Sequence, residues 1–395
     1  MTAYLLDWIG LLARWFHLVA GVSWIGTSLY FVWLDDHLRA PQRDVDTRRG
    51  VAGELWSVHG GGFYHNQKYL LGPAGEPLTA DLHWFKWEAY ATWLSGVAML
   101  ALVYWAGAST LLIDPSVAVL SVPAAVALSA ASLVAGWFVY DALCRLFGER
   151  PLVLGGALYA AFVLAAWALF HVFAGRAAYL HAGAIAGTIM AANVFFVIIP
   201  GQRRVVEAIR AGRAPDPALG ARGKTRSVHN TYLTLPVLFT MISAHYPMTY
   251  GSAYGWLILA LLGLAGVLVR RFFILSHRGR IVLLLPAAAA VSIAAAAALA
   301  LPRPQPVAAV SFAVAGPIIA QRCAVCHAAH PLRRGYAAPP AGVMLDTPEH
   351  IAANAARIDA QAVRSRAMPL GNVTGMTPAE RDQVGAWIAG GAQIP

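Results

Sequence analysis

The chain has 395 residues, of which 58% are hydrophobic and only 12% are charged. Soluble domains average roughly 45–50% apolar and about 25% charged residues, so this composition excludes an ordinary soluble domain as well as intrinsic disorder. The net charge of +10 does not indicate nucleic-acid binding, because the basic residues stand in short clusters between long apolar runs, as they do in membrane proteins.

Eight apolar runs are each long enough to cross a hydrocarbon core of about 30 Å, which takes about 20 helical residues. We therefore expect an all-α, polytopic membrane domain over residues 1–303. The predicted spans are Trp8–Leu34, Trp87–Trp105, Val117–Leu143, Leu152–Phe173, His181–Pro200, His229–Tyr246, Tyr254–Phe273 and Ile281–Leu301.

The basic residues predict the orientation of these spans. Alternate loops, beginning with the one after the first span, hold nineteen Lys and Arg residues, whereas the other loops hold only Arg176. Because loops rich in Lys and Arg stay in the cytoplasm, the N-terminus is expected outside, and eight crossings return the C-terminal domain to the outside. The lipid bilayer is thus one expected partner, and nucleic acid is not.

The loop after the first span contains a glycine triplet, residues 60–62, flanked by polar and aromatic side chains. Glycine permits a close backbone approach, and the flanking groups could stack on and hydrogen-bond a planar polar ligand. The alternative is a flexible loop with a basic residue at the inner surface. The candidate catalytic residues in this loop are His59, His65, Asn66, Gln67 and Lys68.

Ionisable groups inside spans are costly, so each is a functional candidate. In the predicted orientation, His17, His171, His181 and His245 fall in the outer half of the membrane and are candidate ligands of a haem b. Arg14 lies one turn from His17 on the same helix face, where it could meet a haem propionate. The alternative for the other three histidines is an interfacial position facing lipid headgroups. Glu88, Asp141 and Asn193 could form a proton path or satisfy helix packing.

A proline-rich linker, Pro302–Pro306, precedes a domain of soluble character over residues 304–395. In this domain Cys323, Cys326 and His327 form the C-x-x-C-H pattern of covalent haem c attachment. Two thiols add across the haem vinyl groups, and the adjacent histidine ligates the iron. Met368 is the expected second axial ligand, as in cytochromes c, with Met376 as the fallback. A zinc site would need a second ligand pair, which does not follow.

Helix signals support a small cytochrome fold for this domain. Thr347 and Thr377 both precede a proline and an acidic first turn, as N-cap residues do. Thr377 and Glu380 form a capping box for the last helix, where Trp387 is placed to pack against the helix that bears the haem motif. The third cysteine, Cys144, is expected to be a free thiol.

These segments together resemble the bacterial membrane-bound urate oxidase family (urate hydroxylase, PuuD-type), in which a membrane domain is fused to a C-terminal cytochrome c. The likeness runs over almost the whole chain. It is carried by Phe16–Gly26, His59–Lys68, Asn193–Gly201, His229–Pro236, Ile242–His245 and Met368–Asn372. A weaker likeness, confined to the first helix, is to small membrane haem proteins of the protoporphyrinogen oxidase type. It supports His17 as a haem b ligand.

The resemblance implies oxidation of urate to 5-hydroxyisourate, with electrons passing to haem c and then to an external cytochrome c or terminal oxidase. It also implies the bacterial cytoplasmic membrane, with the cytochrome domain in the periplasm. The side from which urate enters stays open. The alternative function is a quinol-linked or partner-linked cytochrome that acts only as an electron conduit. A transporter with a redox sensor has less support, because no pair of broken helices suggests an inverted repeat.

Overall fold

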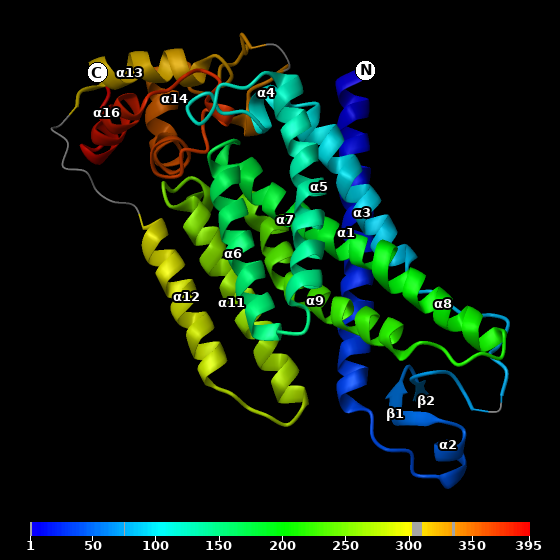
Figure 1. Ribbon diagram of the computed structural model, residues 1–395. Helices are drawn as coiled ribbons and strands as arrows, with labels where there is room; N and C mark the ends of the chain where they lie inside the picture. The colour runs from blue at the N-terminus through cyan, green and yellow to red at the C-terminus, as the bar shows by residue number, and fades with distance from the viewer. Residues whose placement is uncertain (1, 75, 302–309, 334–335) are drawn as a thin grey trace.

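The computed structural model describes residues 2–74, 76–301, 310–333 and 336–395, and most of them are helical (Figure 1). The predicted linker Pro302–Pro306 lies outside the described residues. The helices of the first part of the chain are α1 (Thr2–His37), α2 (Asp44–Arg48), α3 (Trp87–Met99), η1 (Leu100–Trp105), α4 (Ala108–Leu111), α5 (Val122–Phe147), α6 (Pro151–Phe170), α7 (Gly175–Ala192), η2 (Asn193–Ile198), α8 (Ile199–Arg210), α9 (Pro217–Ile242), η3 (Ser243–His245), α10 (Pro247–Tyr250), α11 (Gly255–His277) and α12 (Leu284–Ala300).

Each of the eight predicted runs is helical over most of its length. Within the described residues, five helices are long and apolar enough to cross a membrane: Trp8–His37, Val122–Phe147, Pro151–Phe170, Gly175–Arg210 and Gly255–His277. The other three runs correspond to α9, to α12 and to the α3–η1 pair, where the helix changes to π-helical geometry at Leu100. Five spans therefore have direct support, and the remaining three stay predictions.

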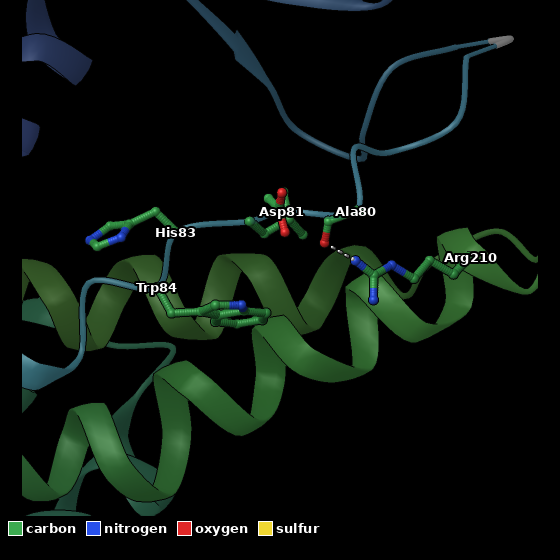
Figure 2. A pocket seen from close by; sticks show the side chains of 6 residues that line it. Ala80, Asp81, His83, Trp84 and Arg210 are labelled. Atoms are coloured by element: carbon green, nitrogen blue, oxygen red, sulfur yellow. Dashed lines mark hydrogen bonds between the residues drawn. The ribbon is translucent and has the colours of Figure 1, made fainter.

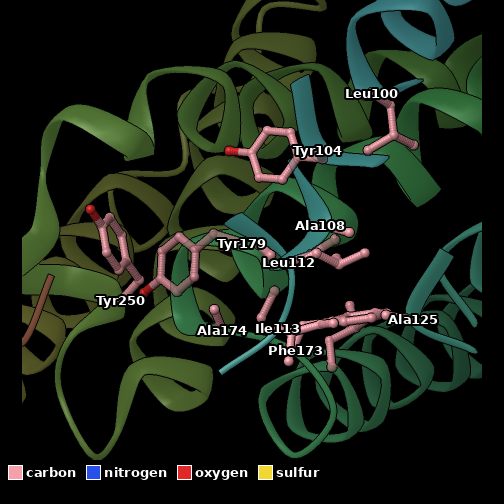
Figure 3. Packing of buried hydrophobic residues seen from close by; sticks show 14 of the residues in the cluster. Leu100, Tyr104, Ala108, Leu112, Ile113, Ala125, Phe173, Ala174, Tyr179 and Tyr250 are labelled. Carbon is pink, nitrogen blue, oxygen red and sulfur yellow. The ribbon is translucent and has the colours of Figure 1, made fainter. Parts of the chain in front are cut away.

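The core of the first part lies where α4 to α7 meet α10 and α11 (Figure 3). Leu112 and Tyr179 have no exposed surface, and Phe173 has 1%. Small residues bring the helices together, as is typical of membrane bundles. A Cβ on Gly183 of α7 would overlap the side chain of Thr240 of α9. Large apolar side chains such as Trp15 and Phe138 are instead exposed on the outer faces of α1 and α5, as a lipid-facing surface requires.

The prediction of an all-helical chain is wrong for one segment. Strands β1 (Val51–His59) and β2 (Gly62–Tyr69) pair antiparallel across the glycine triplet. Gly60 and Gly61 have φ of 58° and 83°, which suits a two-residue hairpin turn because such turns need φ > 0 at both positions. The glycines therefore close a hairpin, which is neither the ligand-approach loop nor the flexible loop that the sequence suggested.

The last part of the chain is a small helical domain with its own core, here called the haem-motif domain (residues 310–333 and 336–395). Its helices are α13 (Phe312–Ile319), η4 (Ala320–Ala324), η5 (Pro340–Gly342), α14 (Pro348–Ala353), α15 (Ala355–Ile358), η6 (Asp359–Arg364), η7 (Leu370–Asn372) and α16 (Pro378–Ala389). The Thr377–Glu380 capping box is confirmed, as is the N-cap at Thr347. Trp387 is 2% exposed and its ring lies 5.6 Å from that of Phe312, so the last helix packs on α13 as predicted.

The haem-motif domain docks on the first part of the chain by close backbone approach. A Cβ on Gly371 of η7 would overlap the carbonyl oxygen of Thr110, and a Cβ on Gly251 would overlap that of Ser365. Ala367 packs against the core around Leu112. Figure 1 shows α13 and α16 at the end of the molecule where α1 begins, with β1 and β2 at the opposite end, as an even number of crossings requires.

Candidate functional site

The C-x-x-C-H segment forms one helical turn at the end of η4. The backbone N–H groups of Cys326 and His327 both donate to the carbonyl oxygen of Cys323, at 3.1 and 3.0 Å. Residues three apart share one face of a helix, so both thiols point to the same side. Nδ1 of His327 lies 3.0 Å from the carbonyl oxygen of Val343. This bond places the proton on Nδ1 and leaves the Nε2 lone pair free, which is the arrangement of a metal-ligating histidine.

Met368 lies in a loop held by a buried arginine. Nη1 of Arg381, a residue 6% exposed, donates to the carbonyl oxygen of Met368 at 2.6 Å and also to that of Ala362. The Met368 side chain packs at the edge of the haem-motif domain core. Met376 is 2% exposed inside that core, where it fills space between helices. The residue types of Cys323, Cys326, His327 and Met368 are those that hold a covalently bound haem, and Met368 is less enclosed by the domain core than Met376.

His181 is completely buried, and both of its ring nitrogens have partners. Nδ1 lies 2.7 Å from the carbonyl oxygen of Ala177, and Nε2 lies 2.6 Å from the hydroxyl of Ser129. Trp105 donates to the same hydroxyl at 2.8 Å. The ring also stacks on Phe173 with 4.8 Å between centroids. This network gives His181 a structural role in joining α5 and α7.

The other candidate haem b residues are dispersed. His17 of α1 packs against α3, with Nδ1 3.1 Å from the carbonyl oxygen of Thr92 and 2.9 Å from the hydroxyl of Ser95, and its Nε2 makes no hydrogen bond within the described residues. Arg14 donates to the carbonyl oxygen of Gly10, and exposed His171 bonds its own helix at Trp167. No hydrogen bond or ring contact within the described chain joins His17 to His171, His181 or His245. A haem b therefore stays a prediction centred on His17.

The five candidate residues of the inner loop lie on the β1–β2 hairpin. Because side chains alternate along a strand, His65 and Gln67 face one side while Asn66 and Lys68 face the other. His65 stacks on Trp56 with 4.2 Å between ring centroids. Lys68 forms an ion pair with Asp35 of α1 at 2.5 Å, which ties the hairpin to the membrane domain. His59 is exposed at the turn.

Glu54 is the buried anchor of this hairpin. Its carboxylate accepts a hydrogen bond from the backbone N–H of Gln42 and lies 2.9 Å from Nε2 of His65. The Gln42 N–H and the His65 contact hold the pKa of Glu54 below its usual value of 4.5, against the effect of burial. A carboxyl group whose pKa is lowered by folding stabilises the folded state above its unfolded pKa, and this contribution is lost as the pH falls through the folded value.

We expect the hairpin amides to exchange hydrogen faster as the pH is lowered below about 4.5, after correction for intrinsic exchange. The Glu54→Gln variant should lose this pH dependence, whereas Glu76→Gln, which removes an exposed carboxylate paired with Arg49, should keep it. Hydrogen exchange read by mass spectrometry measures both. Equal pH dependence in the two variants would rule out Glu54 as the group responsible.

A buried polar cluster joins α5, η2 and α9, and the sequence pattern predicted only isolated members of it. Its residues are Tyr140, Asp141, Asn193, Arg226, His229 and Asn230. Asn193, which has no exposed surface, donates to Tyr140 and Asn230 at 2.9 Å. Arg226 forms an ion pair with Asp141 at 2.6 Å. Because these groups satisfy one another, they can hold the three helices in register without a ligand. The sequence places Arg226 among the loop charges and Asn230 in the His229–Pro236 segment that carries the family resemblance.

A shallow cleft of about 460 Å³ lies beside α8, lined by Ala80 to Trp84 and by Arg210 (Figure 2). Nη2 of Arg210 donates to the carbonyl oxygen of Ala80 at 3.1 Å. The arginine thus fixes the loop before α3 onto α8.

Comparison with protein families identifies the first part of the chain. A family model described as urate oxidase N-terminal matches residues 3–301. The chain belongs to this family. In two further comparisons, neither a curated protein nor a solved structure matched the chain.

The urate oxidase N-terminal match covers all the predicted spans and ends just before the described haem-motif domain. The match relates the helical first part of the chain to urate oxidases. The haem motif at Cys323–His327 lies outside the matched range.

Proposed function

We propose that this protein is a membrane-bound oxidoreductase that converts urate to 5-hydroxyisourate and passes the electrons to a haem c in its own C-terminal domain. The proposal rests on one observation: a urate oxidase N-terminal region and a C-x-x-C-H turn occur in the same chain, and the histidine of that turn has a free Nε2. The docking of the two parts supports direct transfer between them.

The proposed reaction balances without dioxygen. Urate loses two electrons and two protons to give dehydrourate, and water adds to it to give 5-hydroxyisourate. The electrons leave one at a time toward an external cytochrome c or terminal oxidase, which acts as the final oxidant. Peroxide is therefore not an expected product.

The C-terminal domain would hold the haem through thioethers at Cys323 and Cys326, with His327 and Met368 as axial ligands. Bound there, haem c supplies a one-electron acceptor of raised potential. The chain positions the ligands: Val343 orients the His327 ring, and Arg381 holds the loop that carries Met368. A second centre at His17 would let two electrons leave in quick succession.

We propose the bacterial cytoplasmic membrane as the location, with the haem-motif domain in the periplasm. The argument rests on the loop charges and on the position of this domain at the end where α1 begins. Covalent haem attachment outside the cytoplasmic membrane agrees with this orientation.

The decisive experiment is to add urate to the oxidised, detergent-purified protein under anaerobic conditions and to record the visible spectrum. A reduced c-type band should grow to the level reached with dithionite, and 5-hydroxyisourate should form at one molecule per two electrons. A separate b-type band would reveal the second centre. No change with urate, together with full reduction by a quinol, would favour the electron conduit.

A further inference from the structure

A cleft of about 430 Å³ lies where the haem-motif domain docks on the first part of the chain, here called the docking cleft. Its size falls within the roughly 300–1,000 Å³ of small-molecule sites. The membrane side contributes residues from the ends of α4, α7 and α10, and the haem-motif domain contributes 361, 366–368 and 370–372. Met368, the proposed iron ligand, forms part of the wall. Both parts of the chain are therefore needed to complete the cleft.

Cationic and hydrogen-bonding groups line this cleft. Arg176 enters from the start of α7, Arg366 from the haem-motif domain, and His245 from η3. Gln361 and Asn372 add neutral donors and acceptors. Asp114 also lies in the lining, but one of its oxygens already accepts hydrogen bonds from Ser116.

Arg176 has an unused donor. Its Nε is buried and has no hydrogen-bond partner in the described chain. Tyr250 lines the same cleft. Burial raises the pKa of its phenol, and the positive charge of Arg176 opposes the rise. Arg176 is also the one basic residue that the sequence places in an outward loop, against the charge rule that the other loops obey.

Arg366 is held in a conformation that side chains rarely adopt. Its φ of 51° lies in the left-handed region, which is unfavourable for a residue with a Cβ. Strain of this kind persists where the surrounding structure imposes it, and it concentrates at functional sites. Here it accompanies the close docking of the neighbouring Ser365 and Ala367.

We infer that the docking cleft is the urate site, in which Arg176 and Arg366 bind the planar purine anion from the two sides of the domain interface. The inference rests on the proposed function. Urate is an anion at neutral pH and carries ring N–H donors and oxo acceptors, which match the guanidinium, amide and imidazole groups of the lining. Urate then enters from the side of the haem-motif domain.

The length of α11 argues against a site at the opposite end. Arg270 is also buried, and its Nε and Nη2 find no hydrogen-bond partner among the described residues, with His277 and Asp36 in the same region. However, α11 has 23 residues and is about 35 Å long, and Arg270 lies in the third of the helix farthest from the haem-motif domain. The hairpin with His59 and His65 lies at that end too (Figure 1). A substrate bound in the docking cleft touches the wall that contains Met368, so its electrons need no intermediate centre.

The test uses the full-length haem-loaded protein and two readouts. The first is calorimetric binding of 8-azaxanthine, a planar purine that lacks the C8 oxo group and cannot form the product. The second is the KM for urate. Loss of a hydrogen bond to a charged group corresponds to roughly a tenfold to hundredfold change, so Arg176→Gln and Arg366→Gln should each weaken binding and raise KM by about that factor.

Matched variants test whether the effect comes only from loss of a positive charge and whether it depends on position in the molecule. Arg222→Gln on α9 and Arg357→Gln on the haem-motif domain remove exposed arginines away from the cleft and should leave both readouts unchanged. His59→Ala tests the inner hairpin and should also have no effect. Covalent haem content and reduction by dithionite verify that each variant is folded.

The outcomes separate the two proposals. Unchanged KM and binding in both cleft variants, with urate still reducing the haem, would overturn the cleft assignment and leave the proposed function intact. A loss confined to His59→Ala would move the site to the inner hairpin. Failure of urate to reduce the unsubstituted protein would overturn the proposed function itself.

Discussion

Replacing Cys323 and Cys326 together by alanine is expected to abolish covalent haem and all urate-dependent reduction of an external acceptor. The physical reason is that both thiols lie on one helical turn with His327, so their removal deletes both thioether bonds at once. We expect the axial ligands alone not to retain the haem through purification, so the domain would lose its electron acceptor. Covalent haem is measured by its retention under denaturing electrophoresis, and electron flow by anaerobic reduction of added cytochrome c.

Cys144→Ala is the matched control, because it removes the remaining thiol of the chain on α5, within the membrane bundle. It should keep covalent haem and urate turnover. Full urate-dependent acceptor reduction by the double variant would show that the haem-motif domain is not on the electron path, whatever the fate of the haem.

Gly251→Ala is expected to slow urate-driven haem reduction by about fivefold to a hundredfold without loss of haem. Gly251 has φ −82° and ψ −10°, which alanine adopts without strain. The added methyl group would, however, overlap the carbonyl oxygen of Ser365 across the domain interface. Overpacking of this kind costs about 1–3 kcal/mol, which corresponds to that loss of the docked state.

Stopped-flow absorbance measures the rate of haem reduction by urate, and hydrogen exchange at η7 reports whether the domain still docks. Gly187→Ala on α7 is the control, since a Cβ there meets nothing within 4 Å. Reduction by dithionite should be equal in both variants, because this small reductant does not depend on docking. An unchanged rate with urate in Gly251→Ala would mean that electron transfer does not require the observed interface.

The helical organisation could be predicted well because it depends on local properties. The eight apolar runs, the caps at Thr347 and Thr377 and the haem-motif turn all follow from residues close together in the sequence. The β1–β2 hairpin was missed because the same residues suit a loop, and only pairing over eight positions shows that the glycines form a turn. The alternation of apolar and polar residues along β1 and β2 is weak, since polar residues occupy both faces of the hairpin.

Only the haem-attachment motif of the candidate site could be predicted from the sequence. Cys323, Cys326 and His327 are adjacent in sequence, and so their joint role is visible without a fold. The sequence places His17, His171, His181 and His245 at a similar depth in the membrane. Depth alone, however, does not determine which helices pack against each other. In the folded chain His181 hydrogen-bonds Ser129, and His17 hydrogen-bonds the backbone of α3. The fold therefore separates histidines that the sequence had grouped together.

The sequence by itself indicates the membrane character and predicts the orientation and the haem-attachment motif, because each depends on composition or on short spacing. Only the tertiary structure decided that the haem-motif domain docks, and that Arg176 and Arg366 meet across one cleft although 190 positions separate them in the chain. That meeting depends on backbone contacts at Gly251 and Gly371, where the absence of a side chain lets the two parts approach. No local pattern encodes which distant carbonyl group such a glycine will face.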